Sequence, residues 1–560
     1  MHSRHTYCIM AICREKRGGR VYLSEYKSVW EDGKVKHKFV RYLGREGPDG
    51  KPIRRPKHVL DSVEISGTKR YGDVAIMWRL AENLHFPDII DKITHSNSDV
   101  STGKILSMWA VNRALSPEST TGLSRWANRT SLTEIADAPP DKLNKDRFLR
   151  ALDDICLSDD NGDELYDYSL AIEKKLFQKN SAIDTDTLAY DLTSTYFYGT
   201  TCPIARKGYS RDKKIGQLQI VIALAVSRKN KLPIFHQVYP GDTHDIKTAF
   251  QFLSTARGFG IKKGTVIWDR ALTTDDTLDL SQYNGYDLIA GLTARRNDVV
   301  DSLKKAGGME NLDNFVKKCG HGSLYAKSLR TDLFGKPQSV VVCLNTEMRE
   351  DGRGKRNETL MDIKERLEAL SLEKGNWSEG KLRKEALKIV GSNTNIIKPR
   401  IKRKGVQPRI EIQLLKRSVK DQESTDGRYA ILYTDPSLNP RQVVEEYHGK
   451  DFIEKAFRSL KQDIEIRPVR HRTPSRIRSY TLVCVLGYYL RAQLASMLQE
   501  ARPNESFEDF LDDLEDVQRT TVTYGKSSSV RYLNLSNRTR GTLRAMKLSS
   551  VVRQVKSVGE

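Results

Sequence analysis

Five short segments rich in apolar and β-branched residues follow one another between residues 187 and 292. They are residues 188–193, 218–226, 233–239, 264–269 and 287–292. Apolar residues at helical spacing near 247–256 and 274–281 separate the later segments. Three strands in series, followed by alternation of strand and helix, predict a mixed sheet with helices on its faces. The expected fold class is therefore α/β, of the mixed α+β kind.

Other patterns precede this sheet. Residues 7–44 alternate polar with apolar side chains, which predicts a small antiparallel sheet, and residues 47–57 have the Pro, Gly and basic composition of a linker. From about 70 to 178, apolar residues recur at helical spacing, so a helical unit is expected. This unit could hold specific DNA. Because the sequence has no clear helix-turn-helix signature, a role as a scaffold is at least as well supported.

The stretch of about 300–425 interrupts the sheet pattern. It is highly charged and includes a helical segment at 359–388 and strand-like runs at 339–344 and 409–415. Between Lys398 and Arg409 six residues are basic and none is acidic, which fits either a solvated loop or a DNA contact. The sheet pattern resumes at 429–434, and two helices are expected after it.

The charge balance favours a polyanionic partner. Lys and Arg number 94 against 72 Asp and Glu, a formal net charge of +22, which attracts nucleic acid or an anionic membrane. The longest apolar run, residues 481–490, is about half of a bilayer span, so nucleic acid is the expected partner and a membrane is not. Seven scattered cysteines and the lack of an apolar signal core before residue 16 predict reduced thiols in the cytoplasm.

Two aspartates stand in strand-like segments. Asp191 lies in the first strand among apolar and β-branched neighbours, and Asp269 ends the 264–269 segment. A carboxylate buried in a strand without a partner is costly. Each aspartate is therefore expected either to have a partner, such as Arg270 for Asp269, or to be catalytic.

Four polar residues are predicted to share one face of a helix. Tyr447, Lys450, Glu454 and Lys461 are spaced by three, four and seven residues. At about 100° per residue they fall within an arc of roughly 60°. The residues expected on the opposite, buried side are Phe452, Ile453, Ala456, Phe457, Leu460 and Ile464. An ordinary ion-paired, solvated face explains this spacing at least as well as a functional one does.

The stretch around and after this helix is strongly basic. Between residues 455 and 478 eight basic residues stand against two acidic ones, Asp463 and Glu465. The eight are Lys455, Arg458, Lys461, Arg467, Arg470, Arg472, Arg476 and Arg478. Glu454 would repel DNA from such a surface unless it coordinated a metal. Oxygen ligands without a His/Cys cluster suit Mg²⁺ or Mn²⁺.

Together these residues resemble the IS4-type DDE transposases. Tyr447-x2-Lys450-x3-Glu454-x6-Lys461 is similar to the Y-x2-R-x3-E-x6-K signature of that family, with Lys450 in place of Arg. Other segments match in the same order, and the arrangement is most similar to the IS1634 branch. These segments are Leu188-Ala-Tyr-Asp191-Leu-Thr, Gly208-Tyr-Ser-Arg-Asp212, Gly241-Asp-Thr-His-Asp245, Trp268-Asp269-Arg270 and residues 467–478.

The resemblance implies a fold and an order of domains. It implies an RNase H-like core that an insertion domain interrupts, with one acid on the first strand, one after the fourth strand and a Glu on a later helix. The parts expected are an N-terminal β segment (1–60), a helical domain that could bind DNA ends (66–180), the first part of the core (181–300), a charged insertion domain (301–425), the second part of the core (426–500) and a C-terminal region (501–560).

The resemblance also implies a chemistry. Asp191, Asp269 and Glu454 would form a DDE triad that holds two Mg²⁺ or Mn²⁺ ions about 3.5–4 Å apart, for cleavage and strand transfer of DNA. Asp212 and Asp245 match family positions and would orient the site. The DNA-binding residues would be Tyr447, Lys450, Arg458, Lys461, Arg467, Arg470, Arg472 and Arg476.

The implied partner is double-stranded DNA, both the terminal inverted repeats of an insertion sequence and the target. A homodimer would bridge two ends, in the cytoplasm at the nucleoid of a prokaryotic host. Two other functions stay open. One is an RNase H-like nuclease that cuts without joining ends, and the other is a catalytically inactive, transposase-derived DNA-binding protein.

Overall fold

A computed structural model describes residues 10–31, 33–53, 63–96, 98–159, 164–197, 199–211, 216–374, 376–404, 407–524 and 527–552. The chain divides into two compact units. The smaller contains Met1–Lys69, Gln518–Asn534 and Val552–Glu560, and the larger contains Arg70–Val517 and Leu535–Val551. Asp212 and part of the predicted 47–57 linker lie outside the described residues.

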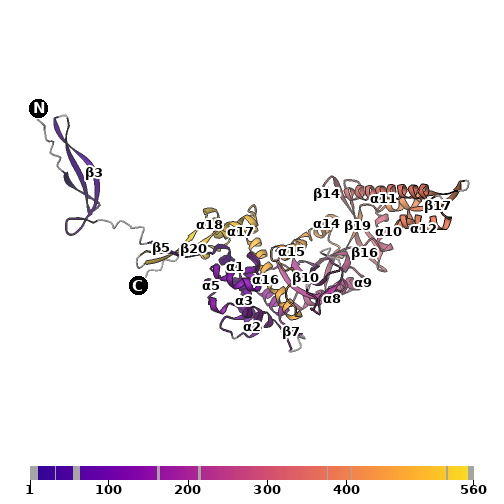
Figure 1. Cartoon of the computed structure of the whole chain (residues 1–560), viewed down its shortest axis with the longest axis horizontal. Coiled ribbons are helices and arrows are strands. Elements are labelled where there is room, and N and C mark those ends of the chain that lie inside the picture. Colours follow the sequence, from indigo (N-terminus) through magenta and orange to yellow (C-terminus); the bar gives the residue numbers. More distant parts are fainter. Residues whose placement is uncertain are drawn as a thin grey trace. The chain divides into compact units, whose positions relative to one another are not determined.

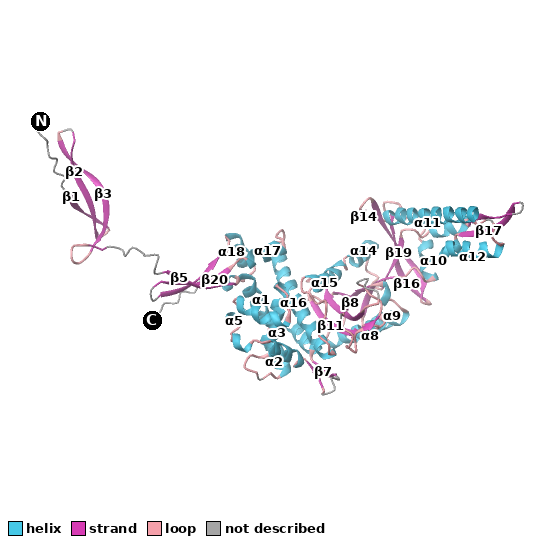
Figure 2. Ribbon diagram, in the orientation of Figure 1, coloured by secondary structure: helices cyan, strands magenta, loops and turns pink. Residues whose placement is uncertain are grey.

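The smaller unit consists of antiparallel strands (Figure 2). One sheet contains, in chain order, β1 (Met10–Arg17), β2 (Arg20–Glu31), β3 (Lys34–Glu46) and β4 (Pro52–Ile53). A second sheet has the order β21 (Ser527–Leu533), β20 (Gln518–Tyr524) and β5 (Val63–Arg70). The predicted N-terminal antiparallel sheet is confirmed for its described residues, whereas the second sheet was not expected from the sequence.

The larger unit begins with helices. They are α1 (Gly72–Asn83), α2 (Phe86–Thr94), α3 (Thr102–Leu115), α4 (Thr120–Arg129), α5 (Leu132–Ile135), α6 (Lys145–Asp153) and α7 (Ser169–Lys179). A hairpin of β6 (Cys156–Ser158) and β7 (Glu164–Asp167) stands between α6 and α7. The Ser101 hydroxyl caps α3 by accepting a hydrogen bond from the Lys104 N–H.

The long helix α16 (Pro474–Ala501) packs against α3. By length and composition α16 could cross a membrane, but 78% of its apolar window is buried inside the protein. It is therefore a core helix, which confirms the buried helix expected for residues 481–490. The helices α17 (Phe507–Glu515) and α18 (Asn537–Ala545) follow it.

A ten-stranded mixed sheet forms the centre of the larger unit. Its path is β11-β10-β8-β12-β13-β19-β16-β15-β14, and β9 pairs with β10. The strands are β8 (Thr187–Tyr196), β9 (Arg206–Lys207), β10 (Leu218–Ser227), β11 (Pro233–Pro240), β12 (Gly264–Trp268), β13 (Tyr286–Gly291), β14 (Phe315–Cys319), β15 (Gly322–Leu333), β16 (Lys336–Asn345) and β19 (Arg428–Tyr433).

The first five long strands have the arrangement of an RNase H-like core. In chain order they take the positions 3-2-1-4-5, and β8, β12 and β13 are parallel while β10 is antiparallel to both of its neighbours. The helices α8 (Asp245–Gly258) and α9 (Asp275–Tyr283) occupy the two predicted positions, and α10 (Asn297–Lys305) follows β13. The mixed α/β fold class is confirmed.

In the charged stretch after residue 300, the strand-like runs predicted at 339–344 and 409–415 are confirmed as strands, but the first of them belongs to the central sheet. Instead of leaving the sheet at once, the stretch first supplies β14, β15 and β16, which extend the sheet beyond β19. The chain then forms an arm, drawn in orange tones in Figure 1. The arm contains α11 (Thr346–Glu373), α12 (Glu379–Val390), β17 (Ile397–Lys404), β18 (Gln407–Leu414) and α13 (Lys416–Glu423). The single helical segment predicted at 359–388 is thus two helices.

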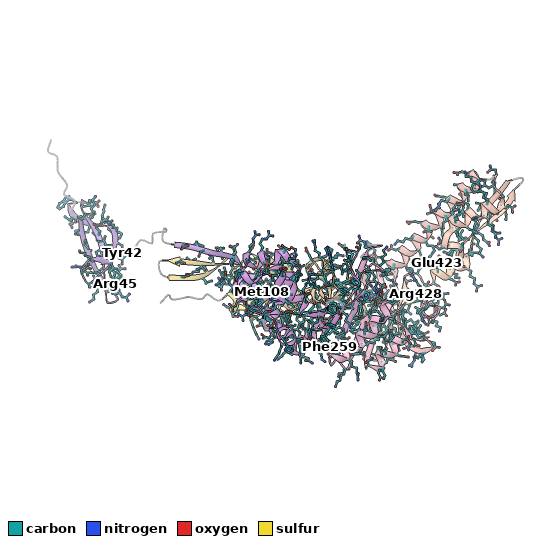
Figure 3. All side chains as sticks on the ribbon, turned by 60° about the horizontal axis from the view of Figure 1, so that its bottom comes forward. Tyr42, Arg45, Met108, Phe259, Glu423 and Arg428 are labelled. Atoms are coloured by element: carbon teal, nitrogen blue, oxygen red, sulfur yellow. The ribbon has the colours of Figure 1, made fainter. Side chains whose placement is uncertain are left out.

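The chain returns from the arm to the sheet at β19. Figure 3 labels Glu423, the last residue of α13, and Arg428, the first of β19, at this junction. After β19 come α14 (Pro440–His448) and α15 (Asp451–Gln462), and α16 follows them.

Candidate active site

Asp191 and Asp269 are neighbours on one face of the core sheet. β8 and β12 run parallel, with Ala189 opposite Ile267. Two residues further along each chain, Asp191 and Asp269 therefore come side by side. The neighbouring residues of β8 and β12 point to the opposite face of the sheet and are buried in the hydrophobic core there. They are Leu188, Tyr190, Leu192, Val266 and Trp268. Because side chains alternate between the faces of a strand, both carboxylates point to the side on which α14 packs.

The electrostatics of Asp191 are those of a partly buried acid beside a second acid. Burial raises the pKa of Asp191 to about 6. The N–H of Leu192 and the charges of Lys450 and Arg211 oppose this shift, and the charge of Asp269 adds to it. A pair of carboxylates in such surroundings favours a cation between them.

This raised pKa predicts a pH-dependent gain in stability for Asp191→Asn in metal-free buffer. Because the pKa of about 6 lies above the ordinary value of 3.8, ionised Asp191 destabilises the fold, and this loss of stability develops as the pH rises from 3.8 to about 6 and then stays constant. The variant should therefore exceed the parent protein by up to about 3 kcal/mol at pH 8, and the difference should vanish near pH 4. Chemical denaturation at both pH values measures this difference. A variant that is less stable than the parent at pH 8 would contradict it.

Asp269 is held by two residues from the α14–α15 region. Lys450 Nζ lies 3.1 Å from Asp269 Oδ1, and the Tyr447 hydroxyl donates to the same oxygen at 3.3 Å. Burial acts to raise the pKa of Asp269, but the Lys450 charge and the Arg270 N–H outweigh it, so the pKa lies below its ordinary value. A Cβ on Gly291 would lie 2.3 Å from the Tyr447 hydroxyl oxygen, so a side chain at this position would push Tyr447 away from Asp269.

The prediction that Tyr447, Lys450, Glu454 and Lys461 share one helix is wrong. Tyr447 belongs to α14, and Lys450 stands just before α15, which carries the other two. Arg228 contacts the break between the two helices, where its Nη1 donates to the Gly449 carbonyl at 3.3 Å and its Nε to Glu446 at 3.0 Å. The predicted buried side is confirmed, because all six of its apolar residues are buried.

Glu454 lies in the first turn of α15, which packs against β8, and its side chain is exposed. Among the described residues, one trio of Asp, Glu, His or Cys has all its ligand atoms within 4.8 Å of one another. That trio is Cys156, Glu164 and Asp167. The structure thus brings Asp191 and Asp269 together but does not bring the oxygens of all three predicted acids within this distance.

A family model described as the transposase DDE domain matches residues 183–490. The match covers more than half of the chain and includes Asp191, Asp269 and Glu454. The chain belongs to the DDE transposase family. Among solved structures, the piggyBac transposase synaptic complex with hairpin DNA is similar to it at 10% sequence identity and a TM-score of 0.40, over 88% of each chain. No curated protein matches this transposase.

The structure separates the predicted DNA-binding residues of this transposase into two groups. Arg458, Arg470 and Arg472 are exposed. The last two follow Val469, which pairs with Phe197 at the end of the strand that carries Asp191. Arg476 instead forms a two-point ion pair with Asp153, through Nε at 2.7 Å and Nη2 at 2.8 Å. Arg476 therefore joins α16 to α6. Lys450 likewise has a partner within the protein, because its ammonium forms an ion pair with Asp269.

Sequence reasoning did not predict the cavity beside the transposase site, although it singled out two of the segments that line it. A cavity of about 520 Å³ lies next to Ala271 and is lined by Lys207, Tyr209, Arg211 and His244, among others. The Arg211 N–H donates to the Ser194 hydroxyl at 3.0 Å, and its guanidinium contacts Asp245 at 2.6 Å. Only the segments that contain Gly208 and Gly241 gave a signal for this region.

Proposed function

We propose that this DDE transposase cuts DNA at the ends of an insertion sequence and joins those ends to target DNA. Asp191, Asp269 and Glu454 would hold the divalent cations on which the reaction depends. The observation that carries the proposal is one acid on β8 and a second directly after the adjacent parallel strand β12 of an RNase H-like sheet, with a lysine ammonium against the second.

The chemistry of these side chains fits Mg²⁺ or Mn²⁺. All three donors are carboxylates, the ligands that these hard cations prefer. The Lys450 ammonium compensates part of the negative charge of the aspartate pair, which is a role that a bound cation could take over. When bound, divalent cations supply Lewis-acid stabilisation of the phosphate and a nucleophile at neutral pH.

The side chains of the transposase have separate tasks in this proposal. Tyr447 and Lys450 hold Asp269 in position from the α14–α15 break. Asp191 must be ionised to act, which its pKa of about 6 allows at neutral pH. Glu454 adds the third carboxylate from the first turn of α15, where the helix dipole favours an anion. The exposed Arg458, Arg470 and Arg472 offer cations to DNA phosphates.

The finer assignments rest on the sequence motif. They are membership of the IS4 type and its IS1634 branch, recognition of terminal inverted repeats, a homodimer that bridges two ends, and a place at the nucleoid. The spacing Tyr447-x2-Lys450-x3-Glu454-x6-Lys461 supports the first of these, and the net charge of +22 supports DNA as the partner.

A strand-transfer assay tests the proposed function. Purified protein is incubated with labelled end DNA and a supercoiled target plasmid, in Mg²⁺, Mn²⁺ or EDTA. Joined products should form with either cation and disappear in EDTA. Nicked ends without joined products would identify a nuclease, and binding without any cut would identify an inactive DNA-binding protein.

A further inference from the structure

The hairpin of β17 and β18 has two chemically different faces. Residues directly opposite each other in an antiparallel pair share a face. Pro399 stands opposite Ile412, and Ile401 opposite Ile410, so one face is apolar. On the other face the opposite pairs are Lys398 with Gln413, Arg400 with Glu411 and Lys402 with Arg409.

The apolar face fixes how the hairpin is mounted on the arm. Ile397 is buried in a small core formed with Ile363 and Leu367 of α11 and with Ala386 and Val390 of α12. Ile410 and Ile412 of β18 pack against the same core. This burial holds one face against the helices, so the polar face is presented outward as a fixed surface.

The outward face is strongly basic. Lys398, Arg400, Lys402 and Arg409 are all exposed, and Glu411 is the one acidic residue among the described side chains of this face. Lys402 pairs with Glu411 at 2.7 Å. Four cations against a single carboxylate, on a surface with a rigid backing, attract a polyanion.

The spacing of these cations suits duplex DNA. Alternate residues on one face of a strand lie about 6.6 Å apart, which corresponds to about two steps of a DNA strand along its axis. A two-stranded ribbon is also narrow enough to enter the major groove. Lys398, Arg400 and Lys402 therefore form a row whose spacing along the axis matches every second phosphate of one strand.

We propose that the outward face of the β17–β18 hairpin binds the phosphate backbone of duplex DNA, as a DNA contact on the arm in addition to the catalytic region. The proposal rests on the proposed function, since it gives that function a second point of attachment to its DNA. The contact is with phosphates and not with base edges, so it acts on end DNA and target DNA alike.

The test compares two double variants that each remove two positive charges from the arm. Lys398→Gln/Arg400→Gln changes the outward face, and Arg383→Gln/Lys384→Gln changes exposed residues of α12. Fluorescence anisotropy measures the Kd of the full chain for a duplex that carries an end sequence and for a duplex of random sequence, between 50 and 200 mM salt as the planned range. Thermal melting checks that each variant folds.

The hairpin variant should bind both duplexes at least about tenfold more weakly, and its plot of log K against log salt should be shallower by about 2. The α12 variant should keep the slope of the parent protein. Unchanged binding by the hairpin variant, or an equal loss in the α12 variant, would overturn the proposal. Weaker binding of the hairpin variant to the end-sequence duplex alone, with unchanged binding to the random duplex, would also overturn the proposal. Because anisotropy needs no cleavage, a protein that binds through the hairpin but never cuts would contradict only the proposed function.

Discussion

Asp191→Ala, Asp269→Ala and Glu454→Ala are each expected to reduce DNA cleavage and strand transfer by at least about 10³-fold, the scale found when one member of a cooperating catalytic group is removed. Each substitution deletes a carboxylate that the proposed cation site requires, and the remaining two acids cannot supply the missing ligand. End-cleavage assays in Mg²⁺ measure the loss. Binding to end DNA should persist, because the basic surface is untouched.

Asp451→Ala is the matched control for Glu454→Ala. Asp451 lies in the same first turn of α15, is exposed and pairs with Lys455 at 2.9 Å. Exposed pairs of this kind contribute about 0–1 kcal/mol, so cleavage should stay near that of the parent protein. If one of the three acid variants cuts DNA as well as Asp451→Ala does, that acid is not part of the site.

Gly241→Ala is expected to lower the free energy of unfolding by at least about 3 kcal/mol. A Cβ at this position would lie 2.0 Å from the carbonyl oxygen of Gln219 and 2.4 Å from that of Arg206. Both atoms belong to the backbone, so β9 and the end of β10 must move. The movement would also disturb the Gln219 amide, which donates to the Tyr209 and Gly241 carbonyls at 3.0 Å. Chemical denaturation measures the change.

Gly258→Ala provides the comparison. Gly258 ends α8, and a Cβ there would meet no atom within 4 Å. Its effect should stay within about 1 kcal/mol. Similar stabilities for the two variants would show that the loop at Gly241 is looser than its contacts indicate.

The sequence was sufficient to predict the part of the fold that carries the two aspartates. β10 is nearly continuous in apolar residues and is buried along most of its length, as a central strand must be. β12 is short, but its apolar run ends at Asp269, so the placement of an acid at a strand end was visible. The register of β12 with β8, which brings the two acids side by side, is seen only in the structure and could not be read from the sequence.

Other features depend on contacts between distant residues and could not be read locally. The break between α14 and α15 is contacted by Arg228, which lies far from Gly449 in the chain. The extension of the sheet by β16 depends on its pairing with β19, on the far side of the arm. The same holds for Arg476, whose basic context suggested DNA although its partner is Asp153.

Iron-directed cleavage of the polypeptide tests the central claim most directly. Fe²⁺ takes the place of Mg²⁺ in the protein, and ascorbate with peroxide then releases radicals that cut the backbone close to the bound metal. If Asp191, Asp269 and Glu454 share the cation site, cuts should appear near all three residues, should be suppressed by excess Mg²⁺ and should be lost in Asp269→Ala. Cuts confined to the neighbourhood of Cys156, Glu164 and Asp167, the trio whose ligand atoms already lie within 4.8 Å of one another, would contradict the account.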